Sequence, residues 1–457
     1  MHLSNSDSVL TQKHIFKTWW PLATSWLLMG FELPILSAFL ARMPDPKIHL
    51  AAYGGVVFPL ALLIESPIIM LLAASTALSK DWLSYKKIRH FMRVAGGALT
   101  LLHVLVAFTP LYDWLIVGLF SPPAEIVEPA RVGLRIMTPW TFAIAYRRFN
   151  QGVLIRFGHP RVVTKGTLVR LLALVSVLSV GFAVGSVPGV VLATGAIAVA
   201  VTSEAFYIGF RVHPVLRDKV RLAPQVTPPL NTHDFFRFYV PLVMTSLLGL
   251  LVFPLGSAAI SRMPRALDSL AVWPVISGFL FLVLSVGIAY NEVVVTLLEG
   301  PHAVAPLRRF AWTLGFISSG VLLLMTATPL ATLWFVHLSG LSPALALLAQ
   351  TSMWFALLRP ALSVMQNWYQ GAIIHHHNTR GITEAVLMFL FVSVLILAGG
   401  VWWKGAPGVY VGQLAFVVGA LVQVLWLRWR SKAALCAVIN RSTVEAESHV
   451  VSPGAVS

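Results

Sequence analysis

The chain has 457 residues, of which 57% are hydrophobic and 11% are charged, with a mean hydropathy of +0.81 and a formal net charge of +16. This composition excludes an ordinary soluble protein and leaves no polar stretch long enough for a separate soluble domain. The positive charge is spread along the chain, which argues against nucleic acid as a partner. The single cysteine, Cys436, excludes an internal disulfide and a cysteine-based metal cluster.

Apolar segments long enough to cross a hydrocarbon core of about 30 Å as helices recur along the whole sequence. The sequence lacks the alternating pattern of barrel strands, so an all-α polytopic bundle is expected. Twelve spans are predicted, at residues 18–40, 50–78, 92–118, 131–153, 167–187, 188–210, 236–258, 269–298, 310–336, 345–369, 383–403 and 406–428.

Most lysine and arginine residues lie in alternate gaps between these spans. The positive-inside rule then predicts that both termini are cytoplasmic, in a multi-pass protein of the inner or plasma membrane. It also assigns Arg147, Arg148, Arg156, Arg161 and Arg170 to a basic cytoplasmic loop after the fourth span. No apolar leader precedes the first span, which is therefore expected to act as the insertion signal.

Two halves of the chain resemble each other. The stretch "LPILSAFLARMP", which ends at Pro44, returns as "FPLGSAAISRMP", which ends at Pro264. Likewise "TPLYDWL" is matched by "TPLATLW", and "NQGVLIRFGHPRVVT" by "YQGAIIHHHNTRGIT". The constant order and nearly constant spacing predict an internal duplication. Six spans per half return the chain to its starting side, so the halves are parallel repeats with a cavity between them.

The predicted organisation is a cytoplasmic tail (1–17), an N-terminal six-helix lobe (18–212), a cytoplasmic linker (213–235), a C-terminal six-helix lobe (236–430) and a second cytoplasmic tail (431–457). Prolines recur inside the spans of both halves. Each removes a backbone donor, so bends are expected there. Ordinary tolerance of proline in membrane helices is the alternative. The predicted hinge or kink residues are Pro34, Pro59, Pro254, Pro274 and Pro360.

This span plan resembles the MOP exporter superfamily, whose best-known branch is the multidrug and toxic compound extrusion (MATE) family. Three segments, "TWWPLATSWLLMGFELPILSAFLARM", "HLAAYGGVVFPLALL" and "ALSKDWLSYKKIRHF", are also similar to the progressive ankylosis family, a group similar in fold to MATE proteins. The resemblance implies a V-shaped pair of lobes that alternates between inward-open and outward-open states. For MATE proteins it implies export coupled to proton or sodium entry, and for the progressive ankylosis group release of citrate, pyrophosphate or nucleotides.

Two buried acids are candidates for carrying the coupling proton or ion. Glu32 lies in the middle of the first span, at the place where the resemblance puts the acidic residue of many MATE proteins, and Glu65 lies in the second span. An ionisable group at that depth faces the bundle interior or water. The alternatives are an interhelical hydrogen bond for Glu32 and a kink-stabilising role beside Pro67 for Glu65. The repeat counterpart of Glu32 is Val252, so any coupling is expected to be asymmetric.

Arg359 lies inside the tenth span and is a candidate for meeting an anionic substrate or a glutamate across the cleft, with snorkelling to the interface as the alternative. Asn291, Gln366 and Asn367 are candidates for lining the substrate cavity with Glu32 and Arg359.

These observations predict a secondary active exporter of small organic compounds, coupled to proton or sodium entry. The acid-rich first lobe favours neutral or cationic compounds, and the alternatives are an exporter of organic or phosphate anions and a flippase for a lipid-linked oligosaccharide. No GxSxG, HExxH or close pair of intramembrane acids is found, so no enzyme, cofactor or metal is expected. The expected partners are a small substrate, a proton or sodium ion and membrane lipids, with the protein as a monomer.

Overall fold

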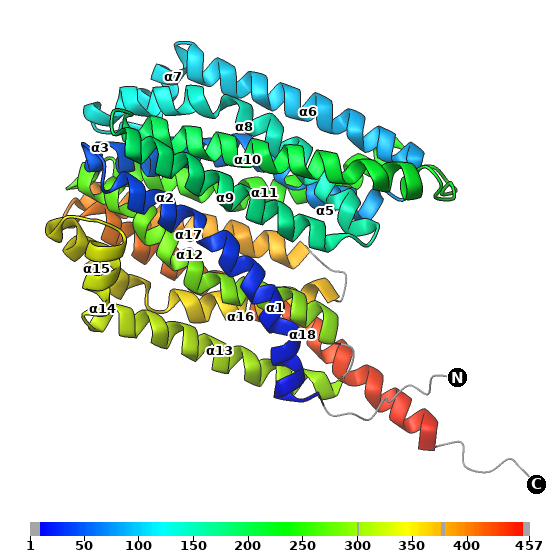
Figure 1. The fold of residues 1–457 in the computed structure, drawn as a ribbon. Helices are drawn as coiled ribbons and strands as arrows, with labels where there is room; N and C mark the ends of the chain where they lie inside the picture. The colour runs from blue at the N-terminus through cyan, green and yellow to red at the C-terminus, as the bar shows by residue number, and fades with distance from the viewer. Residues whose placement is uncertain (1–9, 299–300, 376–379, 451–457) are drawn as a thin grey trace, which may run out of the picture.

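The computed structural model describes residues 10–298, 301–375 and 380–450, and these residues fold into a bundle of long helices joined by short turns (Figure 1). The first half, called the N-lobe, contains α1 (Gln12–Gly30), α2 (Glu32–Leu40), α3 (Pro46–Ala51), the π-helix η1 (Ala52–Val57), α4 (Phe58–Ile69), α5 (Leu71–Leu78), α6 (Trp82–Phe108), α7 (Leu111–Asp113), η2 (Trp114–Phe120), α8 (Ala124–Arg156), α9 (Pro160–Val184), α10 (Gly189–Val215) and η3 (Leu216–Val220).

The second half, called the C-lobe, repeats this order. It contains α11 (Thr232–Ile260), α12 (Ala266–Leu297), α13 (Pro301–Ala327), α14 (Leu330–Thr332), η4 (Leu333–Leu338), α15 (Pro343–Ala356), α16 (Arg359–His375), α17 (Arg380–Trp403) and α18 (Gly408–Val450). Helix α1 begins and α18 ends at the same end of the bundle, which we call the near end, and the opposite end is the far end (Figure 1).

The predicted spans are found as helices. Within the described residues, ten helical segments are long and apolar enough to cross a membrane, and α15 with α16 forms an eleventh that is bent by 43°. Helix α8 is long enough to be the twelfth, because its 33 residues exceed the roughly 20 that a span needs. It is less apolar than the other long helices because it carries five arginines and two glutamates along its length.

The backbone confirms the duplication. Residues with positive φ fall at matching places of the two lobes, as do the π-helices η2 and η4 that follow α7 and α14. The matching pairs are Asp45 with Arg265, Ser121 with Gly340, and Gly185 with Lys404. A left-handed residue recurring at equivalent turns indicates that the two halves descend from one backbone plan.

Helices extend into the predicted tails and linker, whose cytoplasmic location stays a prediction. Helix α1 begins at Gln12 inside the predicted N-terminal tail, and α18 continues to Val450 through most of the predicted C-terminal tail. Between the lobes, helical structure ends at Val220 and resumes at Thr232. The non-helical linker is therefore shorter than residues 213–235, because amphipathic helix ends continue beyond the apolar segments that set the prediction.

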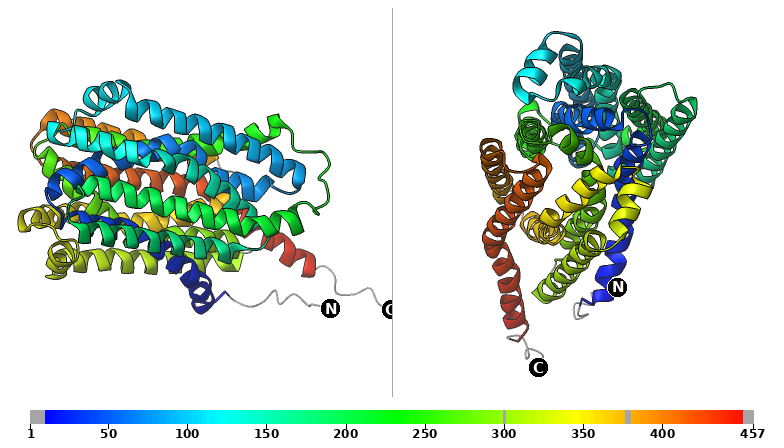
Figure 2. Two further views of the ribbon diagram at one scale, coloured as in Figure 1. Left: turned by 45° about the horizontal axis from the view of Figure 1, so that its top comes forward. Right: turned by 90° about the vertical axis from the view of Figure 1, so that its left-hand side faces the viewer.

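The first helix of each lobe packs against the other lobe at the near end. Helix α1 crosses obliquely to lie beside α12 and α13 (Figure 1), where the Trp19 indole donates to the Val286 carbonyl at 2.9 Å. Helix α11 packs on α4 of the N-lobe, and its Tyr239 hydroxyl donates to the Pro67 carbonyl at 2.5 Å. Figure 2 shows the same crossing from two further sides.

Between the middle of the bundle and its far end, the lobes meet through glycine and proline. A Cβ on Gly54 of η1 would lie 2.4 Å from Cγ of Pro274 on α12, and one on Gly278 of α12 would lie 3.0 Å from Cδ of Pro34 on α2. Normal contacts between carbon atoms are about 3.5–4.0 Å. Glycine is therefore required at Gly54 for the lobes to approach this closely.

At the far end, each lobe also contributes an arginine that binds the other lobe. Arg42, from the first "RMP" stretch, donates to the carbonyl of His337 in the C-lobe at 2.5 Å. Arg262, from the second, donates to the carbonyl of Leu119 in the N-lobe at 2.7 Å and to that of Phe120 at 3.3 Å. We call these two residues the far-end arginines. The repeated "RMP" thus makes the same contact twice, once from each lobe, and an ion pair of 3.0 Å between Lys47 and Asp268 lies beside it.

The five predicted hinge prolines fall in two groups. Pro34 follows the break between α1 and α2, Pro59 follows the π-helix η1, and Pro360 opens α16 at the 43° bend. Pro254 and Pro274 lie inside helices without a break. A hinge role for any of the five stays a prediction.

Candidate functional site

A group of charged and polar side chains lies inside the N-lobe at the middle depth of the bundle. Five helices supply its members, which belong to α2, α4, α8, α9 and α10. We call this group the N-lobe charge cluster, and it consists of Glu32, Glu65, Arg147, Arg148, Gln151, Arg170 and Glu204.

Glu204 on α10 is the centre of the cluster and is fully buried. Its Oε2 accepts from Nη1 of Arg147 at 2.5 Å and lies 3.5 Å from Nε of Arg170, and its Oε1 accepts from Nε2 of Gln151 at 3.0 Å. Arg147 and Gln151 reach the same carboxylate because they are four residues apart on one face of α8. A buried carboxylate with this number of partners is compensated, which is the condition for an ion at this depth.

Arg170 joins this buried centre to Glu32. Its Nη2 lies 2.9 Å from Oε2 of Glu32, while its Nε faces Glu204. The side chain of Glu32 is 19% exposed and that of Arg170 is 11% exposed, whereas that of Glu204 is fully buried. Glu32 is therefore the end of the chain of ion pairs that remains accessible from outside the cluster.

Several polar atoms of the cluster have no hydrogen-bond partner among the described residues. They are Oε2 of Glu65, Nε of Arg147, Nε of Arg148 and Oε1 of Gln151, all of them buried. Glu65 lies within the electrostatic reach of Arg148, Arg147 and Arg170. Buried donors and acceptors without partners are energetically unfavourable, so these atoms form a place where a polar ligand or a proton gains interactions.

The depth of the cluster follows from helix geometry. Arg147 lies nine residues before Arg156, the last residue of α8, which corresponds to about 14 Å of helix. Arg170 lies ten residues after Pro160, the first residue of α9, or about 15 Å. Both distances are close to half of a hydrocarbon core of about 30 Å.

These positions correct the predicted loop. Arg147 is only 4% exposed and sits in α8, Arg148 follows it in the same helix, and Arg170 is well inside α9. The assignment of all three to a cytoplasmic loop is wrong, because arginines that pair with intramembrane carboxylates carry no information about topology. Only the segment near Arg156 and Arg161 forms the turn between the two helices.

The C-lobe has neutral residues at the equivalent places. The matches "NQG" with "YQG" and "PGV" at Pro188 with "PGV" at Pro407 set the correspondence. The charges of the N-lobe charge cluster are thus not repeated at the equivalent C-lobe positions, in line with the pairing of Glu32 with Val252. The C-lobe counterparts of Arg147, Arg148, Arg170 and Glu204 are Gln366, Asn367, Phe389 and Gln423.

The predicted cavity residues of the C-lobe do not join the cluster. Asn291 on α12 donates through Nδ2 to the carbonyl of Asn367 on α16 at 3.2 Å, so these two lie together. Gln366 is the neighbour of Asn367 on α16 and is partly buried. Their role in a substrate cavity stays a prediction.

Arg359 is held inside the C-lobe. It donates to the Phe416 carbonyl, and its guanidinium lies 5.5 Å from the ring of Phe389 and 5.7 Å from that of Phe416. Among the described residues it makes no ion pair, so the expected contact with a glutamate across the cleft is not formed. Backbone carbonyl and aromatic faces instead compensate its charge.

Sequence reasoning missed Glu204, Gln151 and the intramembrane position of three arginines. The sequence does contain a signal for the arginines, which is the need to balance the charge of acids inside apolar spans. Glu32, Glu65 and Glu204 are three acids in otherwise apolar spans, and each requires a partner at the same depth. The arginines near the end of the fourth predicted span and at the start of the fifth are the nearest candidates in the chain.

No protein-family model matches this sequence, and a comparison with curated proteins finds no match. Solved structures match along nearly the whole chain. An inward-facing multidrug resistance MATE family transporter of the MOP superfamily is 14% identical, with a TM-score of 0.64 over 90% of this chain and 98% of the other. The lipid II flippase MurJ, in an inward closed conformation, is 13% identical, with a TM-score of 0.62 over 94% of this chain and 93% of the other.

A MOP superfamily transporter from Pyrococcus furiosus is 16% identical, with a TM-score of 0.58 over 93% of this chain and 97% of the other. Identities this low show the fold and not the substrate. The predicted resemblance is confirmed at the level of the fold, and the local likeness to the progressive ankylosis family stays a prediction. The chain therefore has a MATE-like fold, built as two parallel six-helix repeats.

Proposed function

We propose that this protein is a secondary active transporter that works by alternating access and exports small organic compounds from the cytoplasm. The MATE-like fold supports the transport class. The single observation that carries the mechanism is the ion pair between Glu32 and Arg170, which links an accessible carboxylate to the buried centre of the N-lobe charge cluster. Exchange of partners at this pair is the proposed coupling step.

Proton entry fits this pair better than sodium entry. Arg170 already places a cation beside the Glu32 carboxylate at 2.9 Å, which disfavours a second cation at the same oxygen atoms. A proton on Glu32 has the opposite effect, because it neutralises one of the two carboxylates that hold Arg170. Guanidinium donors are then released toward a ligand.

A second candidate, export of organic or phosphate anions, is favoured by the arginines of the cluster. The preference for cationic or neutral compounds rested on a first lobe with acids and no intramembrane arginine. The cluster instead has three acids and three arginines, and Nε atoms of Arg147 and Arg148 have no partner among the described residues. Guanidinium groups bind carboxylates and phosphates in a bidentate manner, so an anionic substrate uses donors that a cation does not.

The test is transport by the purified full-length protein in proteoliposomes. Efflux of a cationic dye, citrate and pyrophosphate is measured with and without a pH gradient and a sodium gradient. The variants are Glu32→Gln and Arg170→Gln, and the control is Arg217→Gln, which opens an exposed ion pair with Asp218. Glu32→Gln is expected to abolish acceleration by the pH gradient, whereas the control is expected to keep it.

The outcomes separate the alternatives. Loss of dye transport in Glu32→Gln supports the cationic class, and loss of citrate or pyrophosphate transport in Arg170→Gln supports the anionic class. Arg359→Ala reports whether the C-lobe arginine contributes to either. Unchanged gradient-driven transport in Glu32→Gln would overturn the proposed coupling step.

A further inference from the structure

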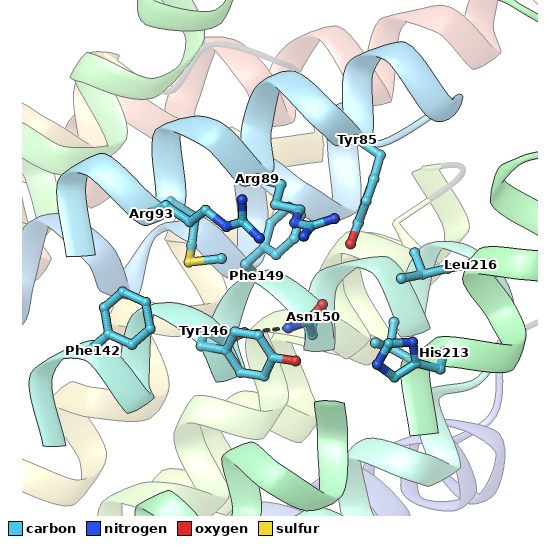
Figure 3. A pocket seen from close by; sticks show the side chains of 11 residues that line it. Tyr85, Arg89, Arg93, Phe142, Tyr146, Phe149, Asn150, His213 and Leu216 are labelled. Atoms are coloured by element: carbon cyan, nitrogen blue, oxygen red, sulfur yellow. Dashed lines mark hydrogen bonds between the residues drawn. The ribbon is translucent and has the colours of Figure 1, made fainter. Parts of the chain in front are cut away.

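The N-lobe also carries a hollow to which no residue of the N-lobe charge cluster contributes. It lies between α6, α8 and the end of α10 and has a volume of about 370 Å³ (Figure 3). Arg89 and Arg93 enter it from α6, Tyr146 and Asn150 from α8, and His213 from α10. On the side that faces the near end of the bundle, the wall of the hollow therefore carries positive charge and groups that can form hydrogen bonds.

Neither Arg89 nor Arg93 is paired with a carboxylate in the part of the chain that the structure describes. The ion pair of Arg147 with Glu204, next to Tyr146 along the chain, belongs to the N-lobe charge cluster, and that of Arg217 with Asp218 lies in the adjoining η3 helix. Asn150, only 2% exposed, uses its amide to donate to the Tyr146 carbonyl at 2.9 Å. The two arginines thus offer unneutralised guanidinium groups beside a buried polar wall.

A second hollow continues the first toward the middle of the membrane. It has a volume of about 510 Å³ and shares Phe142, Tyr146 and His213 with the first. Its other walls are apolar, and they include Phe206 and Phe210 on α10, each 75% exposed. It runs from Thr202 to His213, which is about 16 Å of helix and close to the depth of one leaflet.

We propose that this two-part groove is a binding site for an anionic glycerophospholipid. The phosphate binds Arg89 and Arg93, and an acyl chain lies along Phe142, Phe206 and Phe210. The charge and shape of the groove favour this ligand over two others. A free anion makes no contact with the apolar half, and a neutral lipid brings no negative charge to the arginines. Anionic lipids of the cytoplasmic leaflet are attracted to basic groups at this level.

The repeat supplies a matched control. Arg308 occupies the place of Arg89 in the C-lobe, and Arg309 follows it, both of them exposed at the start of α13. Replacing Arg308 and Arg309 removes the same number of charges from the same end of the bundle. Any effect of general surface charge is then equal for the two double variants.

The experiment measures phospholipid bound to the purified full-length protein by native mass spectrometry, after titration with phosphatidylglycerol or phosphatidylcholine. Wild-type protein is expected to bind one phosphatidylglycerol in preference to phosphatidylcholine. R89Q/R93Q is expected to bind it roughly tenfold or more weakly, since two phosphate contacts are lost. R308Q/R309Q is expected to bind it as the wild type does. If the double variant does not fold, Arg93→Gln alone is measured instead, because Arg93 is exposed. This single variant is expected to show a smaller loss of phosphatidylglycerol binding.

A Phe206→Ser and Phe210→Ser variant tests the apolar half and is expected to lose the same lipid. Equal binding by R89Q/R93Q and wild type would overturn the proposal, as would equal loss in R308Q/R309Q. Competition by inorganic phosphate at concentrations similar to those of phosphatidylglycerol would also overturn it, because it would mark a site for the free anion. None of these outcomes depends on transport.

Discussion

Replacing Gly54 with alanine should open the far end of the protein. The new Cβ would lie 2.4 Å from Cγ of Pro274 and 2.6 Å from its Cβ and Cδ, about 1 Å inside normal carbon–carbon contact. The proline ring has no free rotamer with which to move away, so the lobes must separate. Overpacking of this kind is unfavourable by about 1–3 kcal/mol, which shifts the equilibrium away from this closed state by roughly 5- to 150-fold.

The assay is labelling of one cysteine by a membrane-impermeant maleimide. Leu267 lines a hollow of about 540 Å³ at the far end, to which both lobes contribute. A Leu267→Cys substitution in a Cys436→Ser background reports its opening. The labelling rate is expected to rise at least fivefold when Gly54→Ala is added, in line with the lower bound of the shift.

Gly97→Ala is the matched control. Gly97 also lies in a helix, and a Cβ there meets nothing within 4 Å. It is expected to leave the labelling rate at the wild-type value. A folded Gly54→Ala protein with wild-type labelling would refute the argument, because it would mean that the contact with Pro274 does not hold the far end closed.

Three further predictions concern ion pairs and hydrogen bonds. Glu204→Gln should lower the free energy of unfolding in detergent by about 3–5 kcal/mol, since it leaves Arg147 buried without a carboxylate; a loss below 1 kcal/mol would contradict this. Arg42→Ala and Arg262→Ala should each raise far-end labelling and the double variant should raise it further, whereas a double variant like wild type would show that the far-end arginines do not close the lobes. Burial alone would raise the pKa of Asp81, but hydrogen bonds from the N–H groups of Val226 and Ser84 outweigh it and hold the pKa below its ordinary value. The stabilisation by Asp81 should therefore be complete above the unfolded pKa of about 4 and be lost as the pH falls further. Below that pH the melting temperature should fall more in the wild type than in Asp81→Asn. An equal fall in the two proteins would contradict this role of Asp81.

Much of the fold could be predicted because two sequence signals are strong. Apolar length gives the spans, and the repeated "RMP" and the match of "NQG" with "YQG" give the duplication. The contact made by each "RMP" could not be predicted, since Arg42 and Arg262 bind backbone carbonyls of the opposite lobe. A carbonyl acceptor has no signature in the sequence.

The site could be predicted only in part. Glu32 and Glu65 stand out because isolated acids in an apolar span are unfavourable. Arg170 does not stand out, because it lies just inside a span end next to a basic turn, and its depth depends on where α9 begins. Partners from different helices, such as Glu204 with Arg147, become visible only when the helices are packed.

The crossing of α1 has a consequence for the order of folding during synthesis. Trp19 binds a carbonyl 267 residues later in the chain, so α1 enters the membrane long before its partners in α12 and α13 exist. Contacts of such long sequence separation form late and slowly. The near-end half of α1 must therefore wait in lipid or beside the insertion machinery until the second lobe has been made.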